Sequence, residues 1–352
     1  MLNGNKENET SITSFILLGL GNNTELWPFL FLLFLVLYLV TITGNLIIVL
    51  LVAIDQQLHT PMYFFLGNLS CLETFYSSTI LPKMLGNLLT GNRTITVSGC
   101  LSQYFFFGCC VAIETFLLAA MSYDRYLAIC RPLLYASVMN RNLCFQLIAG
   151  AWLNGLMANS IVVFLIAQFS FCGPNVIDHY FCDLSPLEKL SCSDPSLLKI
   201  IVFLLTFIFT LAPFFLTISS YVFIIGNIIR IQSTIGRQKA FSTCSSHLTV
   251  VCLFYGAIII VYMLPDIPPL RQLNKIFSIF YTILTPLANP LIYTLRNKEI
   301  HKAFWRVQGK LNTFFGKEFF EDIPSSSVLS ILNIVAKPEI VIRGKQSSFL
   351  SC

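Results

Sequence analysis

Seven long apolar stretches dominate the sequence, at about residues 26–54, 61–89, 97–130, 142–167, 197–229, 240–263 and 273–295. A helix needs about 20 apolar residues to cross the hydrocarbon core of a bilayer, and each stretch is long enough. Only 11% of the 352 residues are charged, against about 25% in soluble domains. The sequence therefore predicts an all-α membrane protein, a bundle of seven transmembrane helices.

Four parts follow from this pattern: an extracellular N-terminal segment (1–25), the bundle (26–295), a short helix on the membrane surface (296–310) and a cytoplasmic tail (311–352) that we expect to be disordered. The surface helix is predicted from apolar residues at helical spacing between basic ones. No signal peptide is recognisable in the polar residues 1–10, so we expect the first span to direct membrane insertion.

The orientation follows from the basic residues. Lys and Arg gather after spans three, five and seven, while acids such as Asp178 and Asp183 lie on the other side. By the positive-inside rule, the N-terminus is extracellular and the C-terminus cytoplasmic, in a multi-pass protein of the plasma membrane. The basic residues form no patch of the kind that binds nucleic acid, so we expect lipid and no nucleic acid as partner.

Two kinds of external residue agree with this orientation. Glycosylation triplets begin at Asn8, Asn22 and Asn92. The external cysteines are Cys100, Cys172, Cys182 and Cys192. Four cysteines in an oxidising compartment indicate two disulfides, with three connectivities open. A metal site that uses His179 and Cys182 is the alternative, although it lacks a second pair of ligands.

Polar residues lie where lipid would be expected. Glu73 is twelve residues from Pro61 and Glu114 is eleven from Arg125, so both carboxylates should lie about 16–18 Å deep. Asn45 and Asn289 fall in the inner half as well. A carboxylate in lipid costs several kcal/mol, so these four side chains should meet inside the bundle. They either bind a monovalent cation or proton, or join helices by hydrogen bonds.

An acid and an arginine, Asp124 and Arg125, end the third span. Glu114 and Arg125 share one helix face, which reaches from the outer third of the membrane to its cytoplasmic side. The pair can hold Arg125 or release it toward Tyr221 or Tyr293. His247, two turns into the sixth span, is either a gating residue or an ordinary core histidine. Prolines inside the spans, such as Pro290, are either hinges or static kinks.

Four motifs carry a family resemblance: Leu58–Leu66 (LHTPMYFFL), Met121–Cys130 (MSYDRYLAIC), Lys239–Leu248 (KAFSTCSSHL) and Pro286–Tyr293 (PLANPLIY). With them, residues 8–308 resemble an olfactory receptor, of the rhodopsin-like (class A) G-protein-coupled receptors. Many relatives have alanine in place of Ser122, and the wider class often has aspartate in place of Glu73. The tail beyond about residue 311 is longer than usual for the family.

The resemblance implies roles for matching residues. It makes Asp124-Arg125-Tyr126 the G-protein switch, and Asn289, Pro290 and Tyr293 the hinge of span seven. It pairs Cys100 with Cys182 and Cys172 with Cys192. Glu73 and Glu114 match the positions of a cation-linked cluster. Tyr221 and His247 complete the switch set that we expect.

A ligand pocket is expected between the outer halves of spans three, five, six and seven. Its candidate residues are Phe107, Gly108, Val111, Ala112, Thr206, Phe209, Tyr255, Ile258, Ile259, Tyr262, Ile279 and Thr282. These positions are apolar with a few hydroxyl groups and carry no charge, which favours a small apolar molecule over an amine or a carboxylate.

The predicted function is that of an odorant receptor that activates a stimulatory, olfactory-type heterotrimeric G protein and raises cyclic AMP. No cofactor is expected apart from the monovalent cation. Intramembrane carboxylates would also suit a transporter, but no internal repeat is visible. Catalytic motifs such as His-Glu-x-x-His and Gly-x-Ser-x-Gly are absent, so we expect no enzyme. A receptor for a non-odorant metabolite remains a second alternative.

Overall fold

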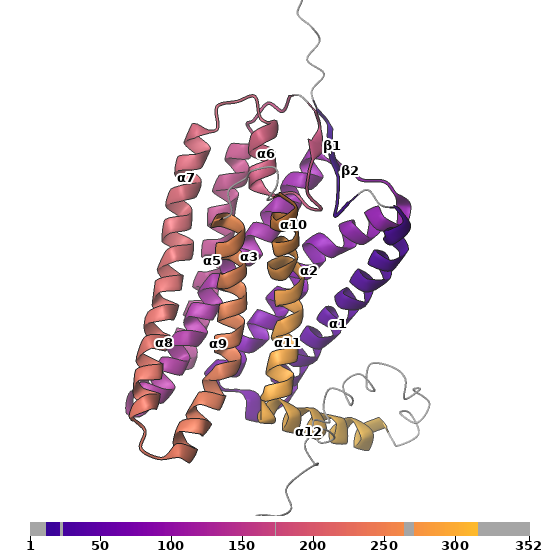
Figure 1. Cartoon of the computed structure of the whole chain (residues 1–352). Coiled ribbons are helices and arrows are strands. Elements are labelled where there is room, and N and C mark those ends of the chain that lie inside the picture. The colour runs from indigo at the N-terminus through magenta and orange to yellow at the C-terminus, as the bar shows by residue number, and fades with distance from the viewer. Residues whose placement is uncertain (1–11, 22–23, 173, 264–270, 316–352) are drawn as a thin grey trace, which may run out of the picture.

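A computed structural model describes residues 12–21, 24–172, 174–263 and 271–315. Seven long helical segments run side by side (Figure 1). They are α1 (Trp27–Ile54), α2 (Pro61–Thr90), α3 (Val97–Cys130), α5 (Arg141–Ile166), α7 (Ser196–Thr206) continued by α8 (Ala212–Arg230), α9 (Thr234–Met263), and α10 (Arg271–Ile279) continued by α11 (Thr285–Arg296). Among the described residues, six of these segments are long and apolar enough to cross a membrane by composition. The seventh, α2, has the length, at 30 residues, but polar side chains interrupt its apolar sequence, the buried Glu73 among them.

Two of the predicted spans are not uniform α-helices. A π-helical turn, Phe207–Leu211, joins α7 to α8, and a second, Phe280–Leu284, joins α10 to α11. Pro213 and Pro286 follow these turns closely. Proline lacks the N–H that would bond the preceding turn, and a widened turn upstream accommodates the missing bond. Each break contains one candidate pocket residue, Phe209 in the first and Thr282 in the second.

Local signals explain several helix ends. The Thr96 hydroxyl accepts a bond from Gly99 N at 3.1 Å and caps α3, and Asn140 Oδ1 accepts one from Leu143 N at 2.9 Å and caps α5. Gly91 ends α2 in the left-handed conformation, with φ of 71°. The caps at Gly91 and Thr96 bracket the short link between α2 and α3.

A small sheet at one end of the bundle departs from the predicted all-α chain. Its strand order is β2 (Thr94–Thr96), β1 (Ser14–Leu17), β3 (Val176–Ile177), with β1 antiparallel to β2 and parallel to β3. Phe15 and Leu17 are fully buried on one face of β1. The N-terminal segment is therefore paired with two loops, an interaction between distant parts of the chain that local patterning does not reveal.

The opposite end carries α12 (Lys298–Phe315), which lies across the bundle (Figure 1). The sequence predicted this surface helix over 296–310. Short elements complete the fold: the 3₁₀ turns Thr24–Leu26 and Gln56–Leu58, and the helices α4 (Pro132–Val138) and α6 (Leu184–Leu190). We call the two ends the sheet end and the α12 end.

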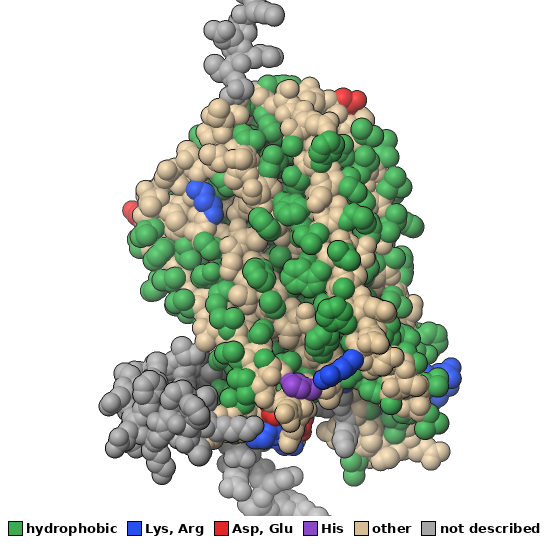
Figure 2. All heavy atoms as spheres, turned by 180° about the vertical axis from the view of Figure 1, so that it is seen from behind, with side chains coloured by type: hydrophobic (Ala, Val, Ile, Leu, Met, Phe, Trp, Pro, Cys, Tyr) green, Lys and Arg blue, Asp and Glu red, His purple; other side chains and the backbone are tan. Residues whose placement is uncertain are grey.

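The interior centres on α3, which packs against α2, α5 and α8. The outer flank is covered with exposed hydrophobic side chains, and most charged side chains on the face in Figure 2 gather near the α12 end. Exposing such an apolar surface to water is unfavourable, whereas the hydrocarbon core of a bilayer would cover it.

Candidate functional site

The acid–arginine pair of the third span lies at the α12 end of α3. Arg125 Nε donates a hydrogen bond to Asp124 Oδ2 at 2.9 Å, and its guanidinium pairs with the same oxygen. Asp124 is fully buried and also accepts a bond from the Tyr135 hydroxyl, in α4, at 2.8 Å. Arg125 is therefore held by its neighbour. This is the restrained form of the pair that the sequence allowed.

Tyr221 and His247, two other predicted switch residues, bond each other. Tyr221 Oη and His247 Nδ1 are 2.6 Å apart, and their rings stack at 5.8 Å. Both side chains are buried, so this contact ties α8 to α9 inside the bundle. Tyr126 lies at the edge of the same region, with its ring 5.9 Å from that of Phe223. The remaining aromatic switch residue, Tyr293 on α11, is also buried.

The four polar residues predicted to cluster are all buried. Asn289 Nδ2 donates a hydrogen bond to Glu73 Oε1, which joins α11 to α2. Asn45 Nδ2 donates to Pro286 O at 3.1 Å, joining α1 to the same helix, and Gly44 permits close approach to Pro290. The carboxyls of Glu114 and Glu73 contact each other. Among the described residues, no N–H or O–H group donates a hydrogen bond to either oxygen of Glu114 or to Glu73 Oε2. The three oxygens could bind a proton or a small cation.

Phe107 anchors a group of aromatic rings beneath the sheet end. Its ring lies 5.4 Å from Tyr76, 4.9 Å from Phe181 and 6.0 Å from Tyr281. Above it, the hydroxyls of Tyr180 and Thr282 are 2.8 Å apart. Phe181 and Tyr180 belong to the loop between α5 and α6, so this loop covers the region expected to bind the ligand.

The other predicted pocket residues differ in whether their side chains face the interior of the bundle or its outside. Ile258 and Tyr255 are buried, and the Tyr255 hydroxyl points to Thr115 O at 3.5 Å. Val111, Ala112, Phe209 and Ile279 are half-buried. Thr206 and Ile259 lie exposed on the outer flank, and Gly108 faces α5, where a Cβ would come within 2.2 Å of Asn159 Oδ1. The side chain of Tyr262 is outside the described residues. The structure thus brings together only part of the predicted wall.

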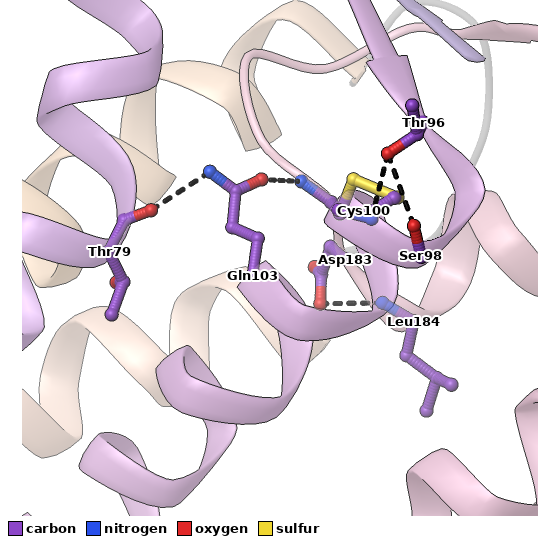
Figure 3. The surroundings of a disulfide bond; sticks show 9 residues. Thr79, Thr96, Ser98, Cys100, Gln103, Asp183 and Leu184 are labelled. Atoms are coloured by element: carbon purple, nitrogen blue, oxygen red, sulfur yellow. Dashed lines mark hydrogen bonds between the residues drawn. A yellow bond between two sulfur atoms is a disulfide. The ribbon is translucent and has the colours of Figure 1, made fainter. Parts of the chain in front are cut away.

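Two disulfides join the external cysteines. Cys100 on α3 is bonded to Cys182, and Cys172 to Cys192, with Cα–Cα distances of 5.5 and 5.9 Å. Figure 3 shows that Gln103 supports the first: its Nε2 donates to Thr79 O at 3.0 Å, and its Oε1 accepts from Cys182 N at 3.0 Å. Cys182 is therefore not available as a metal ligand. In the described part of the chain, no group of three or more His, Cys, Asp or Glu could hold a metal ion.

Of the glycosylation triplets, only Asn92 falls in the described residues. It is exposed, beside β2. Asn8 and Asn22 lie outside the described residues.

Sequence reasoning missed two ion pairs. Lys275, buried on α10, bonds Asp178 of the covering loop at 2.5 Å. Arg306 on α12 makes bonds of 2.9 and 2.6 Å to Asp55, just after α1. The charged character of Lys275 within an apolar span was a signal, but nothing local identified its partner.

Comparison with known proteins decides the family. The family model described as "Olfactory receptor" matches residues 34–310. The chain belongs to the olfactory receptor family. Human olfactory receptor 11L1 is 46% identical over 301 residues, which cover 86% of this chain and 94% of that one. Mouse olfactory receptor 5P62 is 48% identical over 301 residues, or 85% and 95% of the two chains.

The fold agrees. Squid rhodopsin superposes with a TM-score of 0.64 at 16% identity, covering 91% of this chain and 93% of that chain. This likeness supports the seven-helix architecture of rhodopsin-like G-protein-coupled receptors. The receptor is therefore a multi-pass membrane protein that responds to a small molecule through a G protein, and its family is one of receptors and not of enzymes.

Proposed function

We propose that the receptor binds a small, mostly apolar odorant beside Phe107, in the sheet-end half of the bundle. The observation that carries this proposal is the aromatic group of Phe107, Tyr76, Phe181 and Tyr281. Its surfaces are apolar, and the neighbouring hydroxyls of Tyr180 and Thr282 can orient one polar group of a ligand.

The sheet end is extracellular and the α12 end cytoplasmic in this proposal, and the receptor lies in the plasma membrane. The two disulfides at the sheet end support an oxidising compartment there. The basic residues that follow spans three, five and seven support a cytoplasmic α12 end.

Activation is a shift of population. The odorant stabilises an arrangement in which the α12 end of α9 leaves α3, which breaks the contact between Tyr221 and His247. Arg125 then leaves Asp124 and contacts a helix of a stimulatory, olfactory-type G protein, which raises cyclic AMP. A ligand can shift this equilibrium only by its difference in affinity for the two arrangements.

A monovalent cation or a proton between Glu73 and Glu114 would stabilise the resting arrangement. Support comes from three buried carboxyl oxygens that receive no hydrogen bond from an N–H or O–H donor in the described residues, and from the contact between the two carboxyls. Two ionised carboxylates would repel each other in this setting, so a positive charge between them is favourable.

A reporter of cyclic AMP tests the switch. Cells that carry the receptor, Arg125→Ala or Lys302→Ala are exposed to a panel of apolar, amine and carboxylate odorants. Lys302 is an exposed cation on α12 and serves as the charge-matched control. We expect apolar odorants to raise cyclic AMP in wild type and Lys302→Ala, and Arg125→Ala to be silent at equal surface level. An undiminished response of Arg125→Ala would contradict the switch assignment.

The ligand site has its own matched pair. Phe107 is buried in the aromatic group, while Phe106, one residue earlier, is 55% exposed on the outside. We expect Phe107→Leu to weaken the response to an active odorant about tenfold and Phe106→Leu to leave it unchanged. Equal effects of both changes would argue against a ligand beside Phe107.

A further inference from the structure

A groove of about 630 Å³ lies at the α12 end, far from the aromatic group of Phe107. It runs between α1, α2 and the start of α5. Val49, Val52, Gly67 and Cys144 form much of its wall. Its volume is in the range of ligand pockets, about 300–1,000 Å³. Phe64 and Phe145, on its wall, are 38% and 67% exposed, so the groove opens on the outer flank.

Polar side chains stand mainly at one end of this groove. His59 and Thr60 immediately precede α2, and Arg141 is the first residue of α5. Both helices begin at the membrane surface, so these groups stand at the level of lipid headgroups. Of the residues that line the groove, none is an aspartate or a glutamate. The groove therefore combines an apolar wall with one cationic end.

Arg141 has the features of an unused anion ligand. It is exposed, and within the described ranges no carboxylate forms an ion pair with it. By contrast, Arg306 at the same end is paired with Asp55. A guanidinium binds phosphate or carboxylate oxygens well because its N–H groups match them in pairs.

The apolar wall and Arg141 together indicate which kind of molecule the groove binds. A free phosphate would leave the apolar wall uncovered, and an uncharged lipid would leave Arg141 without an anion. We propose that the groove binds an anionic phospholipid of the cytoplasmic leaflet, with an acyl chain along Val52 and Cys144 and the headgroup on Arg141. The leaflet assignment rests on the orientation proposed above. Anionic lipids are concentrated in that leaflet, and each nearby basic residue contributes about 1 kcal/mol of attraction.

Native mass spectrometry of the delipidated full-length receptor in detergent tests this directly. Phosphatidylserine, phosphatidylcholine, a sterol, and water-soluble glycerophosphoserine are titrated separately. We expect one phosphatidylserine to bind at least fivefold more tightly than phosphatidylcholine. Glycerophosphoserine, which has the headgroup but no acyl chain, should bind much more weakly.

Two variants separate the headgroup from the chain. Arg141→Gln should weaken phosphatidylserine binding about fivefold, equivalent to about 1 kcal/mol. Arg230→Gln is the matched control, because Arg230 is an exposed arginine at the end of α8 and does not line the groove. Cys71→Trp, on the groove wall, should weaken binding of both phospholipids by filling the space for the chain.

Other outcomes overturn the proposal. Equal affinity for the two phospholipids would mean that the groove does not recognise the charge of the headgroup. Tighter binding of the sterol than of phosphatidylserine would mean that the groove is a sterol site. Tight binding of glycerophosphoserine would mean that the groove binds a free anion and does not need an acyl chain. Equal losses in Arg141→Gln and Arg230→Gln mean general attraction to a basic surface. Since the measurement needs neither odorant nor G protein, its failure is separate from a failure of the proposed signalling.

Discussion

Lys275 Nζ lies 2.5 Å from Asp178 Oδ1 and thereby joins α10 to the loop that covers the proposed odorant site. The lysine side chain is 5% exposed and the aspartate side chain 44%. The same loop is tied to α3 by the Cys100–Cys182 disulfide. The loop between α5 and α6, called the cover below, is thus held to α3 by a covalent bond and to α10 by an ion pair. The ion pair is the attachment that can open.

This arrangement predicts unequal effects of removing the two charges. Asp178→Asn leaves a buried ammonium without its carboxylate, so we expect a loss of about 2 kcal/mol of stability. Lys275→Met replaces the ammonium with an apolar side chain of similar length and should cost less. Thermal unfolding of the purified receptor measures both.

Asp194→Asn is the matched control, because Asp194 lies between α6 and α7 and its carboxylate accepts hydrogen bonds from Ser196 rather than from a lysine. The double variant Asp178→Asn/Lys275→Met should be more stable than Asp178→Asn alone. If Lys275→Met proved the more damaging single change, the account of the buried charge would be wrong.

His179, next to Asp178, predicts a pH dependence of the same cover. Burial, with the nearby charge of Lys275, lowers the pKa of this imidazole to about 3, although Asp178 acts in the opposite direction. The unfolded pKa is about 6.5, so the unfolded chain takes up the proton first as pH falls. Stability contributed by the neutral imidazole is therefore present above pH 6.5 and is lost as pH falls toward 3, with about 2 kcal/mol lost by pH 5.

The measurement is the shift of the unfolding midpoint between pH 7 and pH 5. We expect His179→Phe, which keeps an aromatic ring against Phe181, to reduce that shift. His59→Gln, at an exposed histidine of the α12 end, should retain the wild-type shift. An identical shift in His179→Phe and wild type would rule out His179 as its source.

Much of the fold was predictable because the bilayer imposes its own rules. Segment length and apolar composition identified the bundle, and α3 spans the predicted residues 97–130. The sheet was not predictable, since β1 pairs with loops near residues 95 and 176. The π-helical turns were also missed, because proline signals a kink without specifying its geometry.

Residues of the candidate site were predictable where their depth in the membrane alone determines whether they are buried. Counting residues from helix ends placed Glu73 and Glu114 inside the bundle, and the structure buries both. The pocket wall was predicted less well, because the rotation of each helix about its axis determines which side chains face the pocket. Thr206 and Ile259 face outward. The pair Lys275–Asp178 was missed, since its members are 97 residues apart and meet only through loop folding.

Glu114 predicts sensitivity to sodium. Its carboxyl lies against that of Glu73 and, in the described residues, receives no hydrogen bond from an N–H or O–H donor, so a sodium ion between the two carboxyls would compete with the active arrangement. We expect replacement of sodium by N-methylglucamine to increase odorant potency about fivefold in wild type and not in Glu114→Gln. Glu188→Gln, in α6 at the sheet end, is the control. Equal sodium effects in wild type and Glu114→Gln would exclude a sodium site there.

Gly108 distinguishes helix packing from ligand contact. A Cβ at this position would lie within 2.2 Å of Asn159 Oδ1, whereas one at Gly150 would meet nothing within 4 Å. Gly108→Ala must therefore turn the Asn159 amide, which donates to Gly155 O, or separate α3 from α5, at a cost of about 1–3 kcal/mol. We expect lower surface delivery and a lower unfolding midpoint for Gly108→Ala, no change for Gly150→Ala, and partial recovery in Gly108→Ala/Asn159→Ala. A change in odorant potency with normal stability would instead make Gly108 part of the ligand wall.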